Sequence, residues 1–302
     1  MSKRTIFYFT MALATALSLI FAPVVKSQGI QESIEELTGD TGKGYLQPLF
    51  NSFANNLNAG MYTSAAIPRL GLRLRINLVA MGTMIGDDDR VFTATPPQPY
   101  AQTPVKTATV FGEKGAVVEG PGVSYRFQDG HLTGDFIPFA VPEVEIGAVM
   151  GTIARVRFFS AKLPGETGEE LGEIKLAGYG IQHSLSQYVP LFPVDVSAGF
   201  FYQTFDIGDI MECQTLNVGL QASKSFRMLT LFGGVNYESG KMEVSYNYQG
   251  KEGGERIAFA LDSETSFRFH VGAGLNLYLV HLNGAVYIGP QVTAMIRAGI
   301  GL

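Results

Sequence analysis

The sequence lacks most of the features on which disulfide-rich domains, helical membrane proteins and nucleic-acid-binding proteins depend. Cys213 is the only cysteine, so neither an intrachain disulfide nor a cysteine-based metal site can form. After the N-terminal region no stretch offers about 18 consecutive apolar residues, which excludes a bundle of transmembrane helices. The formal charge of −5 and the absence of a basic run argue against a nucleic-acid partner. Charged residues make up only 16% of the chain, against roughly 25% in ordinary soluble domains.

The N-terminus has the pattern of an export signal. Lys3 and Arg4 form a positive start, an apolar stretch runs from Ile6 to Val25, and Ser27 offers a small residue at which cleavage fits. The alternative for residues 1–27 is a single N-terminal membrane anchor. We expect the signal to be removed, leaving enough chain for one large domain.

Two short helices are predicted after the signal, within residues 28–66. The first covers Ile30–Leu37, and the glycines of Gly39–Gly44 are expected to end it. The second covers Tyr45–Leu57, with an apolar stripe formed by Leu46, Leu49, Phe50, Phe53 and Leu57 and a polar face opposite. Each helix is too short to be stable alone. We therefore expect both to pack against another surface, as a plug in a barrel lumen or a cap at its periplasmic mouth.

From residue 69 onward the pattern changes to the alternation of β-strands. Leucine and isoleucine occupy one face of the first strand, and Arg69, Arg73 and Arg75 occupy the other. An arginine that faced lipid near the bilayer midplane would cost about 2–4 kcal/mol. If the strand crosses a membrane, these arginines must face a lumen.

Four hairpins are predicted from matching apolar residues across candidate turns. The turns are centred on Asn283-Gly284, Gly151, Ser225-Phe226 and Ser239-Gly240, with the first giving two strands of roughly 15 residues. In each hairpin one face is apolar and the other polar, small or charged. The polar faces place further charged side chains inside: Glu143, Glu145, Arg155, Arg157, Arg268, His270 and Arg297.

The strand pattern predicts an all-β fold, an antiparallel transmembrane β-barrel over residues 67–302. Further strands are expected near Gly172–His183, Val194–Phe205 and Arg256–Asp262. Residues 86–140 are expected to form a long loop or plug region with one strand inside it, within Ala116–Phe127. The total is about twelve strands, with fourteen as the alternative, because bacterial single-chain barrels use even numbers.

The chain resembles a family of uncharacterised bacterial outer-membrane barrel proteins of unknown function. The likeness is most specific in the opening GYLQPLFNSFANNLNAGMY of residues 44–62, followed by IPRLGL at residues 67–72. More distantly, the layout is similar to the FadL-type transporters of hydrophobic compounds, which have an N-terminal helical hatch inside a barrel. The Asn-Pro-Ala motif of that hatch is absent, and the most similar tripeptide here is Gln47-Pro48-Leu49. A transport role taken from that group is an analogy of fold.

Enzymatic motifs are not found. His183 is followed by Ser184 and Ser186, but strand residues one and three positions apart face opposite ways, so neither serine shares its face. Asp87–Asp89 lacks the alternating spacing of a calcium loop and is interpreted as a solvated turn. We expect no catalytic residues, no metal site and no cofactor.

The sequence therefore predicts a protein of the bacterial outer membrane, in contact with its lipids and with the barrel-assembly machinery. The favoured function is a channel or transporter for a small solute, hydrophobic if the likeness to FadL-type proteins extends to the cargo, gated by the N-terminal helices. The alternatives are a closed structural or interaction barrel without transport, and a secreted soluble β-rich protein. The charged cluster has two interpretations: opposite charges that brace the wall and fill the lumen, or a constriction that filters solutes by charge.

Overall fold

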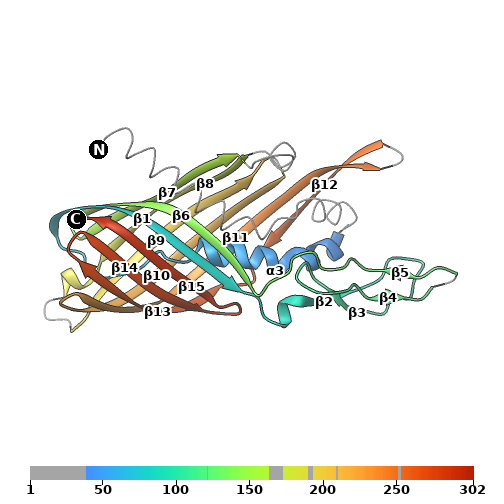
Figure 1. Cartoon of the computed structure of the whole chain (residues 1–302), viewed down its shortest axis with the longest axis horizontal. Helices are drawn as coiled ribbons and strands as arrows, with labels where there is room; N and C mark the ends of the chain where they lie inside the picture. The colour runs from blue at the N-terminus through green and yellow to red at the C-terminus, as the bar shows by residue number, and fades with distance from the viewer. Residues whose placement is uncertain (1–38, 121, 163–172, 190–192, 209, 251–252) are drawn as a thin grey trace.

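Ten antiparallel strands close into a barrel in the computed structural model, which describes residues 39–302 except 121, 163–172, 190–192, 209 and 251–252 (Figure 1). Each wall strand pairs with the next wall strand along the chain, β10 with β11 included. Pairing of the first strand, β1, with the last, β15, closes the ring. The wall consists of β1 (Leu70–Met84), β6 (Phe136–Val149), β7 (Thr152–Lys162), β8 (Glu173–Ser184), β9 (Asp195–Ile207), β10 (Met211–Phe226), β11 (Leu229–Gly250), β13 (Phe267–Leu277), β14 (Val280–Ile288) and β15 (Thr293–Gly301). The predicted export signal and the predicted helix over residues 30–37 lie outside the described residues.

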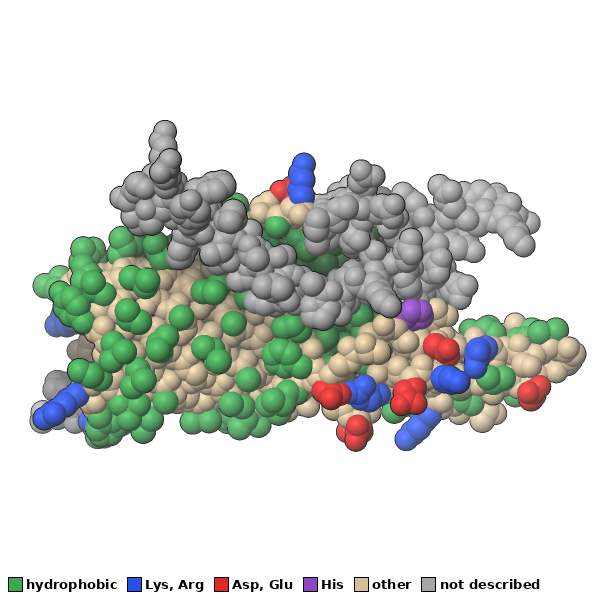
Figure 2. Space-filling model, viewed as in Figure 1, with side chains coloured by type: hydrophobic (Ala, Val, Ile, Leu, Met, Phe, Trp, Pro, Cys, Tyr) green, Lys and Arg blue, Asp and Glu red, His purple; other side chains and the backbone are tan. Residues whose placement is uncertain are grey.

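The wall is apolar on the outside and polar on the inside. On β13, for example, Phe269 and Val271 are exposed while Arg268 and His270 are buried, as alternation along a strand requires. Figure 2 shows hydrophobic side chains spread over the barrel surface. This arrangement is the reverse of a soluble barrel, whose apolar side chains fill its interior.

The predicted count of twelve or fourteen strands is wrong, because two predicted turns lie inside strands and two predicted strands lie outside the ring. Asn283-Gly284 lies inside β14, and the chain turns instead at residues 278–279 and 289–292. The region predicted as a two-stranded hairpin therefore forms three strands, β13, β14 and β15. Ser239-Gly240 lies inside β11, which runs on without a turn. The strand near residues 256–262 is β12 (Gly253–Asp262), which pairs with residues 241–250 of β11 and with no other described strand, so it lies outside the closed ring.

Two other hairpins are present with a shifted register. At the Gly151 turn, Glu143 pairs with Arg157 and Glu145 with Arg155, whereas the sequence pattern had paired Glu145 with Arg157. The β10–β11 turn lies at residues 227–228, two residues beyond the predicted centre. Both shifts are by even numbers, which leave every side chain on its predicted face.

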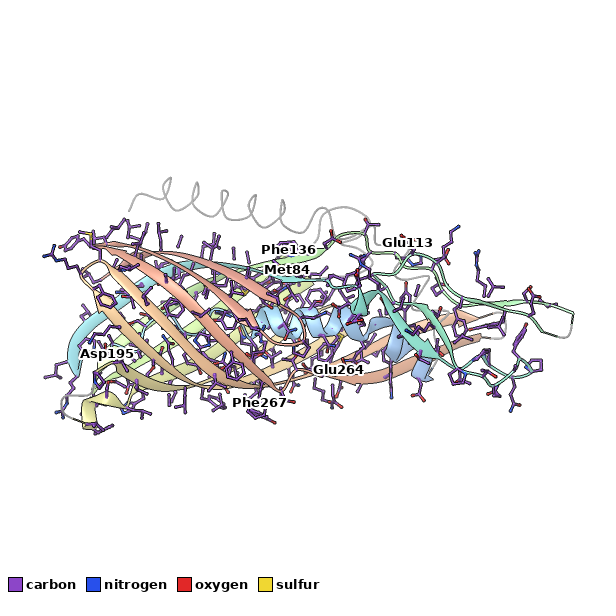
Figure 3. The ribbon with its side chains drawn as sticks, turned by 90° about the horizontal axis from the view of Figure 1, so that it is seen from below. Met84, Glu113, Phe136, Asp195, Glu264 and Phe267 are labelled. Atoms are coloured by element: carbon purple, nitrogen blue, oxygen red, sulfur yellow. The ribbon has the colours of Figure 1, made fainter. Side chains whose placement is uncertain are left out.

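The two ends of the barrel differ. At one end β6–β7, β10–β11 and β13–β14 are joined by two-residue turns, and the chain ends there at Leu302. A 3-10 turn, η2 (Ser186–Tyr188), lies in the β8–β9 connection at the same end. At the other end the β11–β12 hairpin projects, together with an arm formed by residues 85–135 (Figure 3).

The arm contains small elements that do not join the wall: η1 (Asp88–Arg90), β2 (Val91–Ala94), β3 (Val105–Ala108), β4 (Val117–Val118) and β5 (Tyr125–Arg126). The strand predicted within Ala116–Phe127 is therefore a small hairpin, β4–β5, and not part of the barrel. The end of the predicted irregular region belongs to the wall, since β6 begins at Phe136.

In the described part of the chain, one α-helix, α3 (Gly39–Leu57), precedes the barrel. The predicted break at Gly39–Gly44 is helical. A Cβ on Gly44 would lie 2.3 Å from Cδ2 of Phe92 in β2, so the glycine allows the arm to pack closely on the helix. Among the described residues, no helix is both long and apolar enough to cross a membrane.

Candidate functional site

The barrel lumen is occupied by the chain itself. We call residues 39–66 the inner segment: α3 followed by an irregular stretch that leads to β1 at the short-turn end. The first half of α3 packs between the arm and the β11–β12 hairpin, and its second half lies within the wall (Figures 1 and 3). Asn58, Ala59, Met61, Tyr62 and Ala65 of the irregular stretch are all buried. A length of polypeptide therefore extends through the lumen.

Both the apolar and the polar face of α3 pack against other parts of the chain. Of the predicted apolar stripe, Leu46, Phe50 and Leu57 are buried, and Leu49 and Phe53 pack against the same cluster. The opposite, polar face is also buried and hydrogen-bonds to the wall and its rim. Asn56 donates to the carbonyl of Ile137 (2.9 Å) and accepts from Thr83 (2.9 Å), Asn55 donates to Gln291 (3.0 Å), and Asn51 donates to Glu264 (2.9 Å).

Four arginines of the wall donate hydrogen bonds to backbone carbonyls of the inner segment. Arg268 donates to Asn55 (2.8 Å), Arg157 to Leu57 and Ala59 (3.2 and 3.1 Å), Arg297 to Gly60, and Arg155 to Met61. The acceptors follow one another along the chain from residue 55 to 61. Each arginine belongs to a different strand, except that β7 supplies two. The wall thus holds the inner segment by its backbone, at the C-terminal end of α3 where helix carbonyls lack helical partners.

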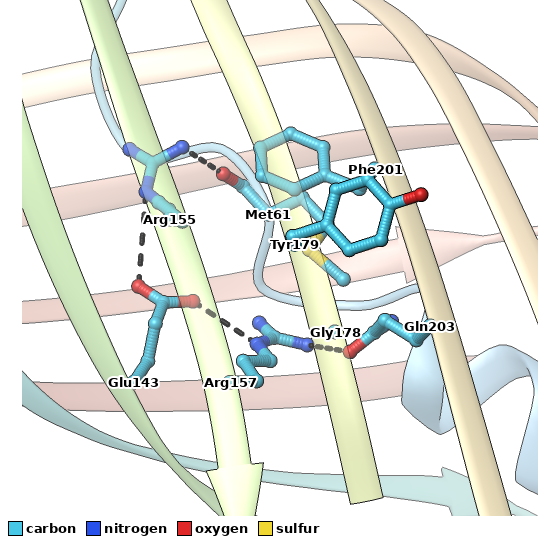
Figure 4. Close-up of a pocket in the computed structure, with 8 residues that line it drawn as sticks. All are labelled: Met61, Glu143, Arg155, Arg157, Gly178, Tyr179, Phe201 and Gln203. Carbon is cyan, nitrogen blue, oxygen red and sulfur yellow. Dashed lines mark hydrogen bonds and ion pairs between the residues drawn. The ribbon is translucent and has the colours of Figure 1, made fainter.

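Three buried glutamates compensate these arginines in part. Glu143 accepts from Arg157 (3.0 Å) and lies 3.0 Å from Arg297, and Glu145 accepts from Arg155 (2.8 Å). Figure 4 shows Glu143 between Arg155 and Arg157, with Arg155 reaching the carbonyl of Met61. Glu238 accepts from Arg268 at 2.8 Å. All seven side chains are almost fully buried.

The other predicted lumen residues lie in different settings. Arg73 and Arg75 are half-buried near the short-turn end, where both approach Glu145, at 3.4 and 3.7 Å. Arg69 precedes β1 and is exposed, and it makes no ion pair with the described residues, so it lies apart from the cluster. His270 is buried and stacks between the rings of Tyr62 and Tyr287.

Tyr62 fixes the irregular stretch to the wall. Its hydroxyl donates to Asn217 (3.2 Å), and its ring meets Phe201 edge-on. Gly199 and Gly219 are paired across β9 and β10, and a Cβ on either would come within 2.9 Å of the tyrosine side chain. This contact was not predicted, because the spacing of small residues in the two strands says nothing about which ring they admit.

Several polar wall residues of the site were missed in the sequence. Gln203 donates to the carbonyl of Leu57 (2.6 Å), Asn217 to that of Asn58 (3.1 Å) and Gln182 to that of Ser64 (2.9 Å). Each lies at an inward position of β8, β9 or β10. Extending the alternation through these strands would have identified them, as it identified the arginines.

The lumen is tightly filled where the inner segment meets β7. A recess lined by Met61, Glu143, Arg155, Arg157, Phe201 and Gln203 leaves no room for a water molecule. At this recess the polar side chains are paired and the space between them is filled.

Comparisons with known proteins find only low similarity. No curated protein sequence matches the chain. Similar solved structures include the attachment invasion protein Ail of Yersinia pestis with a heparin analogue (9% identity, 77% of this chain and 100% of that one, TM-score 0.29). Others are an outer-membrane channel from Pseudomonas putida F1 (10%, 80% and 100%, TM-score 0.31) and a FadL homologue of Pseudomonas aeruginosa (10%, 87% and 98%, TM-score 0.26).

These values carry no functional argument. The family is shown by sequence, because a model described as a family of unknown function matches residues 1–302. The predicted resemblance to an uncharacterised family is therefore confirmed, and the chain belongs to the family of unknown function DUF6588.

Proposed function

We propose that the protein is an outer-membrane channel or transporter for a small solute, closed at rest by the inner segment and opened by its displacement. The observation that carries the proposal is the path of residues 58–66. They are irregular polypeptide and not wall side chains, yet they run within the barrel to its short-turn end. A small barrel can be filled by the side chains of its own strands. A wall that leaves room for polypeptide leaves a passage when that polypeptide moves.

The outer surface supports placement in a bilayer. Exposed leucine, isoleucine, valine and phenylalanine side chains cover β1, β13 and β15. β13, β14 and β15 have 11, 9 and 9 residues, close to the roughly 9–11 needed for a tilted transmembrane strand. Lys175, Glu212 and Lys224, charged side chains that face outward, lie near strand ends. A secreted soluble protein would expose this apolar surface to water.

The same surface gives an orientation. Bacterial barrels have short turns on the periplasmic side and long loops outside. We infer that the two-residue turns and Leu302 face the periplasm, and that the arm and the β11–β12 hairpin face outward. The inner segment then closes the lumen from its external mouth down to the periplasmic end.

A closed structural barrel is the second candidate. The paired charges around Glu143 and the absence of space for water favour a lumen that never opens. In that case the inner segment would be a permanent core. The two candidates predict different conductance when the contacts that hold the inner segment in the lumen are weakened.

The test uses the full-length protein in planar lipid bilayers. In the loosened variant, Phe50→Asp/Leu57→Asp, two fully buried apolar anchors of the helix become carboxylates, while the wall is unchanged. We expect step-like conductance that the wild type lacks or shows rarely, because unpaired buried carboxylates favour a displaced helix. Lys43→Asp, an exposed change on the same helix, is the matched control and should behave as the wild type.

Folding of each variant is checked by its faster migration on unheated detergent gels. Gly60→Val is a second way to loosen the segment: Gly60 has φ +74°, and its Cβ would lie 2.8 Å from Val79. If both folded variants remain silent, the protein is a closed barrel and the channel proposal is wrong.

A further inference from the structure

The lumen holds an excess of positive charge. Six arginines face inward in the described part of the barrel: Arg73, Arg75, Arg155, Arg157, Arg268 and Arg297. Four acidic residues face inward with them: Glu143, Glu145, Glu238 and Asp195, which is half-buried at the short-turn end and pairs with the buried Ser223. The formal excess is two positive charges. A network that only braced the wall would be expected to balance, because unpaired buried charges are costly.

In the closed state the excess is accommodated by carbonyl oxygens. Arg155, Arg157, Arg268 and Arg297 direct guanidinium donors at the backbone of residues 55–61. These oxygens carry partial negative charge and no formal charge. Once the inner segment moves, each guanidinium keeps its wall acceptors, which are Gln182, Gln203, Glu238 and Glu143, but loses its carbonyl acceptor and presents a free N–H to the open passage. Guanidinium groups match the oxygens of carboxylates and phosphates geometrically, often with two parallel hydrogen bonds.

Two further arginines extend this path to the periplasmic end. Arg73 and Arg75 share Glu145, whose other partners are Arg155 and Arg297. Among the described residues, neither arginine donates a hydrogen bond to the inner segment. They are half-buried and reachable from the short-turn mouth, so positive charge continues from the level of Asn55 to that mouth.

We propose that the solute is a small anion bearing a carboxylate or phosphate group, which takes the place of the inner-segment carbonyls on the wall arginines. This rests on the proposed function, since it names the solute class of the same passage. The surrounding wall supports a hydrophilic anion: Gln182, Gln203 and Asn217 would line the vacated path as uncharged hydrogen-bonding groups.

Charges outside the lumen do not oppose this selectivity. The arm has seven acidic and four basic residues, and Figure 2 shows charged side chains on its surface. Exposed charges are screened within about 8 Å at physiological salt. Charges enclosed by a low-dielectric wall act on a passing ion with little screening.

The experiment measures the reversal potential of the loosened variant across a potassium chloride gradient. We expect chloride to pass several-fold more readily than potassium, and inorganic phosphate added on one side to reduce the chloride current. Adding Arg73→Glu/Arg75→Glu changes the formal lumen charge from two positive to two negative and should invert the selectivity. If the Arg73→Glu/Arg75→Glu variant does not fold, Arg73→Gln/Arg75→Gln replaces it in the experiment and should lower the preference for chloride.

The matched control is Arg227→Glu, an exposed arginine in the β10–β11 turn at the same end, outside the lumen. It should leave the reversal potential unchanged. If the loosened variant conducts but prefers potassium, or shows a preference that the Arg73 and Arg75 changes do not move, the anion proposal is wrong and the channel remains. If neither loosened variant conducts, the channel is wrong and the anion proposal falls with it.

Discussion

Replacement of Arg268 is the most informative single change for the hold of the wall on the inner segment. Its Nε donates to Glu238 (2.8 Å), one Nη donates to Thr293 (3.0 Å) and the other to the carbonyl of Asn55 (2.8 Å). The guanidinium also lies 5.1 Å from the centre of the Tyr287 ring. No part of the residue is measurably exposed.

Arg268→Met keeps much of the side-chain volume and removes the charge. Glu238, which is 1% exposed, then loses its only ion-pair partner among the described residues. Removing one member of a buried ion pair costs about 3–5 kcal/mol, most of it from the charge left behind. Adding Glu238→Gln replaces that carboxylate by a neutral amide. The double variant should therefore be more stable than Arg268→Met, by about 2 kcal/mol, because a neutral polar group costs less to bury.

The assay is urea unfolding in lipid vesicles, followed by the fraction of protein that migrates as the compact form on unheated detergent gels. The reasoning is refuted if Arg268→Met costs less than about 1 kcal/mol, the value of an ordinary exposed pair. It is also refuted if the costs of the two substitutions simply add.

Three further predictions concern the inner segment. Gly219→Val should displace Tyr62, with a loss of about 1–3 kcal/mol in the same assay from overpacking, whereas Gly284→Ala, whose nearest foreign atom is 3.8 Å away, should cost far less. Equal effects would contradict the packing described. Tyr62→Phe should cost about 1 kcal/mol, since it removes the hydrogen bond to Asn217, and an unchanged midpoint would show that the bond contributes nothing. Cys213 is fully buried in the cluster that holds α3. It should resist maleimide labelling in the folded wild type and react in the loosened variant; labelling at equal rates would mean that the helix does not cover it.

Side-chain direction could be predicted from the sequence, and strand connection could not. Arg155, Arg157, Arg268 and Arg297 all face inward as their alternation predicted. Alternation has a period of two, so it is satisfied by every register that differs by an even number. That is why Glu145 was paired two residues away from its partner, and why Asn283-Gly284 was taken for a turn.

The turns themselves had weak local signals. β13 and β14 are joined at Tyr278, which adopts φ +59°, and β10 and β11 at Arg227, with φ +54°. Neither residue type favours this region of backbone conformation. The strands impose these turns, whereas Asn-Gly inside β14 shows that a good turn sequence is overridden when strand pairing on both sides favours extension.

The sequence predicted the helix and its apolar stripe, but not the detailed contacts that the helix makes inside the barrel. Periodicity identified the apolar stripe and the polar face opposite, but it did not predict that Asn51 and Asn55 on that face contact the rim and wall. The carbonyl contacts of Arg157 and Arg268 could not be predicted, because a backbone acceptor has no sequence signature. They follow from tertiary placement of the segment inside the barrel.

The most direct measurement is conductance of the loosened variant carrying a reversible lock between helix and wall. A Cβ on Gly240 would lie 3.1 Å from that of Ala54, near the roughly 3.8 Å typical of a disulfide. We therefore combine Ala54→Cys and Gly240→Cys with Cys213→Ala, which removes the native thiol. The displaced-helix mechanism predicts silence when the pair is oxidised and conductance after reduction, with each single-cysteine variant indifferent to the reductant. Equal conductance in the oxidised and reduced states would show that ions pass without movement of α3, and would contradict gating by the inner segment.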